Sequence, residues 1–118
     1  MKLFTKQQIT ILDENGRASH PIGGQYEPEY LKPVVKLFTP DSQATWLLVS
    51  TDPHYPEIAY GLADLGLGCP ELGDICLNEL TSVKGPLGLP VERDRHFTPT
   101  KTLGEYAKEA ARHGRITV

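Results

Sequence analysis

The chain has 118 residues, a formal net charge of −3, 39% hydrophobic and 23% charged side chains. This length predicts a single domain, residues 1–118, with its own core. The composition excludes a disordered or fibrous chain. Residues 1–83 carry 5 basic and 11 acidic side chains, whereas residues 84–118 carry 7 and 4. This balance argues against general nucleic-acid binding, which favours a strongly basic surface, and leaves room for a local basic patch.

Hydropathy and cysteine usage bear on the compartment. No apolar run approaches the ~20 residues that cross a bilayer. The start, MKLFTKQQ, turns polar after two apolar residues, so it lacks the apolar segment of a signal peptide. Cys69 and Cys76 match neither a redox nor a zinc pattern, and we expect both to be buried free thiols. We therefore expect a cytoplasmic protein without membrane association.

The N-terminal segment predicts a helix with one conflict. Thr5 and Gln8 have the spacing of a capping box. Gly16 stands where a helix could end in the left-handed conformation. These signals predict a helix over residues 6–15, although the β-branched residues 9–11 favour a strand.

Apolar and β-branched segments then predict the sheet. Turn-forming residues join the first two segments into a hairpin, and Gly66–Pro70 forms a later turn. Asn78 can cap a short helix over residues 79–84. The expected strands are residues 34–38, 45–50, 57–65, 72–77 and 91–97.

The last helix carries the clearest signals. Thr102 and Glu105 form a second capping box, Gly114 follows the last turn, and apolar residues recur at helical spacing between them. The order of elements predicts an α+β fold. We expect a mainly antiparallel sheet of about four to five strands, an N-terminal helix, a short middle helix and a C-terminal amphipathic helix.

Known catalytic and metal-binding patterns do not occur in the sequence. The four histidines lack the spacing that places two imidazoles on one helical face. The serines and cysteines lie in no recognised nucleophile motif. We therefore expect no catalytic residues, no metal and no cofactor.

The strongest candidate site combines Glu71 with the run Glu92, Arg93, Asp94 and Arg95, set among glycine and proline turns. In a strand the two acids would share one face and the two arginines the other. The arginines could then clamp a phosphate or a carboxylate. Two structural explanations stay open, a charged edge strand that prevents aggregation and an ion pair between Arg93 and Glu71.

Two features bear on nucleic-acid binding. Lys108, Arg112 and Arg115 share one stripe of the last helix, which favours either a solvated face or phosphate contacts. A surface for stacking on bases could be made by Trp46, Tyr55, Tyr60 and Phe38. Aromatic residues in strands more often fill the core, so we expect Trp46 and Phe38 in the core, and Tyr55 stays open. Nucleic acid is thus a possible partner, whereas a protein partner is favoured.

Three segments resemble the uncharacterised bacterial family called domain of unknown function 2958. They are VVKLFTPDSQATWLLVS, AYGLADLGLGCPELGDICLNEL and GPLGLPVERDRHFTPTKTLGEYAKEA. The resemblance covers about residues 3–116, and it is most specific at residues 70–73 and 85–94. It implies a small protein of plasmids and other mobile elements, and it brings no established activity, cofactor or catalytic residue.

The leading hypothesis is a binding module of a mobile element that recognises its partner through Glu71 and residues 92–95. An anti-defence role, in which the protein blocks a host immune complex, is a special case. One alternative is a small enzyme, a hydrolase or nuclease-associated factor, that uses Glu71, Arg93 and Asp94. Another alternative is single-stranded nucleic-acid binding.

Overall fold

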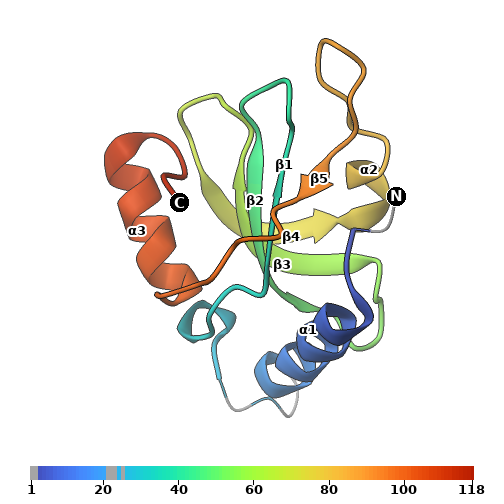
Figure 1. Cartoon of the computed structure of the whole chain (residues 1–118). Coiled ribbons are helices and arrows are strands. Elements are labelled where there is room, and N and C mark those ends of the chain that lie inside the picture. Colours follow the sequence, from blue (N-terminus) through green and yellow to red (C-terminus); the bar gives the residue numbers. More distant parts are fainter. Residues whose placement is uncertain (1–2, 21–23, 25) are drawn as a thin grey trace.

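A computed structural model describes residues 3–20, 24 and 26–118, which form helices around one antiparallel sheet (Figure 1). The strand order is β4-β3-β2-β1-β5, so the chain winds outward from β1 to β4 and returns to place β5 beside β1. The predicted α+β class, with helices near both ends of the chain, is confirmed. The elements are α1 (Lys6–Ser19), the 3₁₀ helix η1 (Pro28–Tyr30), β1 (Val35–Phe38), β2 (Thr45–Thr51), β3 (Ile58–Asp64), β4 (Glu71–Cys76), α2 (Leu77–Leu80), β5 (Glu92–Arg93) and α3 (Leu103–His113).

Both faces of the sheet are covered, because β2 is central and carries apolar residues on both sides. Trp46 and Leu48 belong to one core cluster, and Leu47 and Val49 belong to the other. Successive strand residues point to opposite faces, so the two clusters lie on opposite sides of the sheet. The first cluster includes Leu12 of α1, and the second includes residues of α3. Figure 1 shows these two helices on different sides of the sheet.

Helix α1 begins as predicted and ends later than predicted. Thr5 caps it, and both hydrogen bonds of the capping box with Gln8 are present. The alternative of a strand over residues 9–11 is wrong. The expected end at Gly16 is also wrong, because Gly16 is buried inside the helix. A Cβ at this position would overlap the backbone carbonyl oxygen of Thr51, so Gly16 allows α1 to lie directly against β2.

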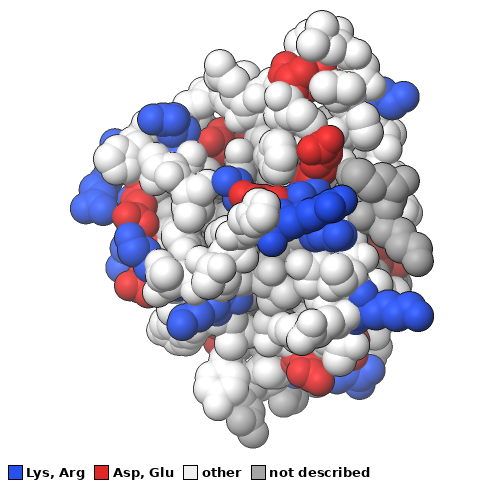
Figure 2. Space-filling model, in the orientation of Figure 1, with Lys and Arg blue, Asp and Glu red and all other residues white. Residues whose placement is uncertain are grey.

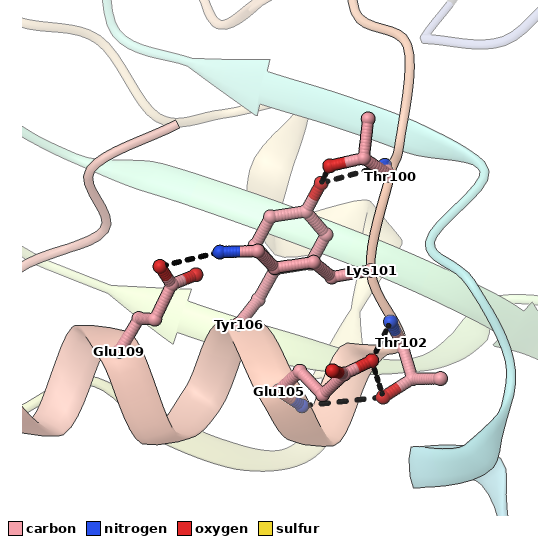
Figure 3. Close-up of polar contacts among 6 residues, drawn as sticks. All are labelled: Thr100, Lys101, Thr102, Glu105, Tyr106 and Glu109. Atoms are coloured by element: carbon pink, nitrogen blue, oxygen red, sulfur yellow. Dashed lines mark hydrogen bonds and ion pairs between the residues drawn. The ribbon is translucent and has the colours of Figure 1, made fainter.

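Helix α3 confirms the C-terminal prediction. Thr102 accepts a hydrogen bond from the Glu105 N–H, and the Glu105 carboxylate accepts one from the Thr102 N–H (Figure 3). Gly114 ends the helix in the left-handed conformation, with φ of 71°. Arg115 therefore lies beyond the helix, and the expected stripe of three basic residues is reduced to Lys108 and Arg112. None of the helices within the described ranges combines the length and the apolar character that a membrane crossing requires.

Several smaller expectations are corrected between β3 and β5. The middle helix covers Leu77–Leu80, and Cys76 rather than Asn78 is its N-cap residue. Strand β5 contains only Glu92 and Arg93 instead of residues 91–97. Cys69 is exposed and Cys76 is half-buried, so neither thiol is buried as expected. The predicted Gly66–Pro70 turn is confirmed, with positive φ at Gly66 and Gly68.

Candidate functional site

The charged run at residues 92–95 lies at one edge of the sheet. Glu92 and Arg93 pair with Phe38 and Leu37 of β1. Asp94 leaves the strand, but its N–H still donates to the Lys36 carbonyl oxygen. Figure 2 shows basic and acidic side chains gathered in the middle of this face, over the place of β5 in Figure 1. Because β5 is so short, the predicted alternation of acids and arginines along one strand does not extend to residue 95.

Asp94 is held by its neighbours. Its carboxylate accepts a hydrogen bond of 2.8 Å from the His96 N–H and lies 3.5 Å from the Lys36 Nζ. The His96 hydrogen bond, followed by the charge of Lys36, lowers the pKa of Asp94. Asp94 is therefore a charged partner of Lys36, and it does not have the raised pKa that a general acid needs at neutral pH.

Glu71 lies at the other edge of the sheet. It is the first residue of β4 and pairs with Ala63 of β3. Strands β3, β2 and β1 separate β4 from β5. The expectation of one epitope that joins Glu71 to residues 92–95 is thus corrected. The ion pair between Arg93 and Glu71, which was one of the two structural explanations, does not fit this strand order either.

A cleft of about 780 Å³ lies elsewhere on the molecule. Its walls come from the end of α1, the residues around η1, the end of β2 with the turn after it, the start of β3 and the middle of β4. Ligand-binding clefts in proteins usually have volumes of roughly 300–1,000 Å³. The sheet and two helical segments therefore enclose a space of the size that ligand sites have.

The cleft is acidic. Glu27, Glu29, Asp52 and Asp74 contribute to its walls, and no lysine or arginine does so among the residues that the structure describes. Tyr26, Tyr30 and Tyr60 also line it. Four carboxylates in one concave surface create a negative potential, which attracts cations and repels phosphate groups.

Tyr60 and Glu29 form a hydrogen bond within the wall of the cleft. The Tyr60 hydroxyl donates to Glu29 Oε1 over 2.6 Å. Burial, followed by this hydrogen bond and the charge of Glu29, raises the pKa of Tyr60. The nearby charges of Asp74 and Glu27 act in the same direction. The phenol therefore stays protonated at neutral pH and fixes the position of the Glu29 carboxylate.

Asp52 shapes the turn after β2. One of its carboxylate oxygens accepts hydrogen bonds from the backbone N–H groups of His54 and Tyr55. The bond from His54 is the largest cause that lowers the pKa of Asp52. The rings of His20 and His54 meet edge to face nearby, with their centroids 5.2 Å apart. Asp52 thus supports the cleft wall and adds a permanent negative charge to it.

The described residues offer little for catalysis. No group of three or more histidine, cysteine or acidic side chains among them could hold a metal ion. Ser82 donates its hydroxyl to the Glu79 carbonyl oxygen within the same turn. Ser50 lines the acidic cleft. Within the described ranges, no hydrogen bond joins its hydroxyl group to a general base.

A family model described as "Protein of unknown function (DUF2958)" matches residues 3–117. The chain belongs to this family. The resemblance found in the sequence is thereby confirmed over nearly the whole chain. No curated protein and no solved structure matches the chain.

Sequence reasoning missed the cleft of this DUF2958 member because its walls come from distant segments. Asp52 and Asp74 lie in no catalytic or metal-binding sequence pattern, and they stand 22 positions apart in the chain. One local signal was available: two glutamates and two tyrosines surround Pro28 in the segment YEPEY, residues 26–30. Such a dense group of acids and aromatic rings beside a proline can mark a binding loop.

Proposed function

We propose that this protein is a non-enzymatic interaction module whose acidic cleft binds a positively charged group of a protein partner. The observation that carries the proposal is the composition of the cleft walls, with four carboxylates and three tyrosines. An arginine or lysine side chain would meet carboxylates for charged hydrogen bonds and aromatic rings for cation–π contacts. A nucleic-acid backbone would meet only like charge there.

The segment of residues 92–95 is proposed as a second contact surface of the same module. Glu92 and Arg95 are exposed there, and Glu71 belongs to the opposite edge. Under this proposal the protein acts in the cytoplasm of bacteria that carry a plasmid or another mobile element. A host defence complex is the class of partner that this setting suggests.

The two alternative functions receive less support. An enzyme that uses Glu71, Arg93 and Asp94 needs these side chains in one cleft, whereas Glu71 and Arg93 belong to opposite edge strands. Single-stranded nucleic-acid binding needs stacking rings beside a basic groove, whereas Trp46 is buried in the core and the tyrosines of the cleft lie beside four carboxylates. For these reasons the proposal names a protein partner.

Calorimetric titration with a capped peptide of alternating arginine and threonine tests the proposal. We expect binding that weakens with added salt and that a glutamate–threonine peptide does not show. The double variant Glu27→Gln, Asp74→Asn should weaken binding by about fivefold or more, since ~1 kcal/mol of charge interaction is lost. Glu79→Gln, an exposed acid of α2 outside the cleft, is the matched control. Equal affinity of all three proteins would contradict the proposal.

A further inference from the structure

Among the residues that the structure describes, strand β4 pairs only with β3 and forms one edge of the sheet. It has six residues, whereas β5 at the other edge has two. Glu71, Leu72 and Asp74 are exposed along it. Edge strands present unpaired backbone groups that can pair with another chain, and binding domains use such edges to add a peptide as an extra strand.

The register shows which backbone groups of β4 point outward. In two antiparallel strands, residue pairs that exchange backbone hydrogen bonds alternate with pairs whose N–H and carbonyl groups point away from the partner strand. The Leu77 N–H donates to the Glu57 carbonyl oxygen, and the register continues from there through Ala59–Ile75 to Gly61–Gly73. The intervening residues Leu72 and Asp74 therefore direct their N–H and carbonyl groups to the free side of β4.

The same register joins this edge to the cleft. Asp74 lies directly opposite Tyr60 across β3 and β4, so both side chains are on one face of the sheet, and both line the cleft. A residue of an added strand that lies opposite Asp74 would place its side chain on this face as well. One side chain of a bound peptide would thus reach the acidic cleft while its backbone pairs with β4.

We propose that an extended basic segment of the protein partner adds to β4 as an antiparallel strand and places an arginine or lysine in the cleft. This inference rests on the proposed function and names its mode of recognition. A second copy of the chain is the less suitable occupant. Two β4 strands paired around Asp74 would place this carboxylate directly against its copy, and like charges across strands are destabilising.

Backbone methylation of the arginine–threonine peptide separates strand addition from attraction by charge alone. A residue opposite Asp74 must direct its N–H toward β4, since Asp74 points outward. N-methylation of the arginines should therefore abolish binding although all charges remain. N-methylation of the threonines, whose N–H groups face away from β4, should leave the affinity unchanged. Amide hydrogen exchange at Leu72 and Asp74 should slow when the unmodified peptide binds.

Each outcome decides between the two proposals. Strand addition is supported if only the peptide with methylated arginines loses affinity and if amide exchange at Leu72 and Asp74 slows when the unmodified peptide binds. Equal affinity of both methylated peptides without slowed exchange overturns strand addition and leaves the charge-based function standing. If the unmodified peptide does not bind at all, both proposals fail.

Discussion

Gly16 of α1 lies so close to the carbonyl group of Thr51 in β2 that no side chain fits between them. The same helix donates a hydrogen bond of 2.8 Å from the Asn15 side chain to the Val49 carbonyl oxygen. These two contacts fix α1 against the central strand. They also position the end of α1, which forms one wall of the cleft.

Gly16→Ala should destabilise the protein. In a helix interior, alanine is favoured over glycine by roughly 0.5–1 kcal/mol. Here the added methyl group would overlap a backbone atom of Thr51, and overpacking costs about 1–3 kcal/mol. The clash should exceed the gain, because a carbonyl group within a central strand cannot rotate away. We expect a lower free energy of unfolding by urea denaturation.

Gly73→Ala is the matched control for this substitution. An added Cβ at Gly73 meets no atom within 4 Å, and its φ is not positive. Replacing a glycine by alanine at a permissive position stabilises a protein by about 0.4–1 kcal/mol, because the unfolded chain then has less conformational entropy. Gly73→Ala should therefore be neutral or stabilising. Equal losses of stability for both variants would show that Gly16 has no special packing role.

Gly16 also illustrates what the sequence could predict about the fold. Capping boxes depend on residues three positions apart, so the starts of α1 and α3 and the end of α3 at Gly114 were predictable. A glycine that follows amphipathic residues has two explanations, an end of the helix or a close contact with another element. Only the position of β2, which is distant in sequence, distinguishes them.

Asp41 connects the β1–β2 loop to the loop before β5. Its Oδ2 accepts a hydrogen bond of 2.6 Å from the Leu87 N–H, and its side chain packs against Gly85. Asp41→Ala should cost about 1 kcal/mol, the usual net contribution of such a bond. It should also free the neighbouring loop, so that trypsin cleaves faster after Lys84. Ser42→Ala in the same loop is the control, and unchanged cleavage of Asp41→Ala would refute this role.

Tyr106 connects α3 to the segment before it. This tyrosine is 5% exposed, and its hydroxyl accepts a hydrogen bond of 3.0 Å from the Thr100 N–H (Figure 3). Tyr106→Phe should lower the free energy of unfolding by about 1 kcal/mol, because the N–H loses its partner. Tyr30→Phe is the control, since Tyr30 is 72% exposed. Equal urea midpoints for the two variants would argue against the bond.

Tyr60 should make stability fall at alkaline pH. Its pKa in the folded protein lies above the ordinary value of 10.0, so the folded state holds the proton more tightly than the unfolded state. The stabilisation is complete below pH 10 and is lost as pH rises through the folded pKa. Tyr60→Phe should remove the phenolate absorbance that develops well above pH 10 and flatten this part of the stability profile. If Tyr60→Phe instead removed phenolate absorbance that develops around pH 10, the ordinary pKa of a tyrosine, the prediction would be contradicted.

The sequence was less informative about the site than about the fold. Residues 92–95 were predicted as a charged group because they are adjacent in sequence, and one of them, Asp94, forms an ion pair with Lys36. Glu71 was added because glycine turns surround both segments, but strand order decides which edges meet. Asp74 and Glu29 approach Tyr60 only through the pairing of β4 with β3 and the return of the chain at η1.

The most direct test of the acidic cleft is an amide chemical-shift map of the labelled protein during titration with the arginine–threonine peptide. The proposal predicts shifts at Thr51, Tyr60 and Asp74, around the cleft walls. Shifts that gather instead at residues 92–95, or the absence of any shift, would contradict it.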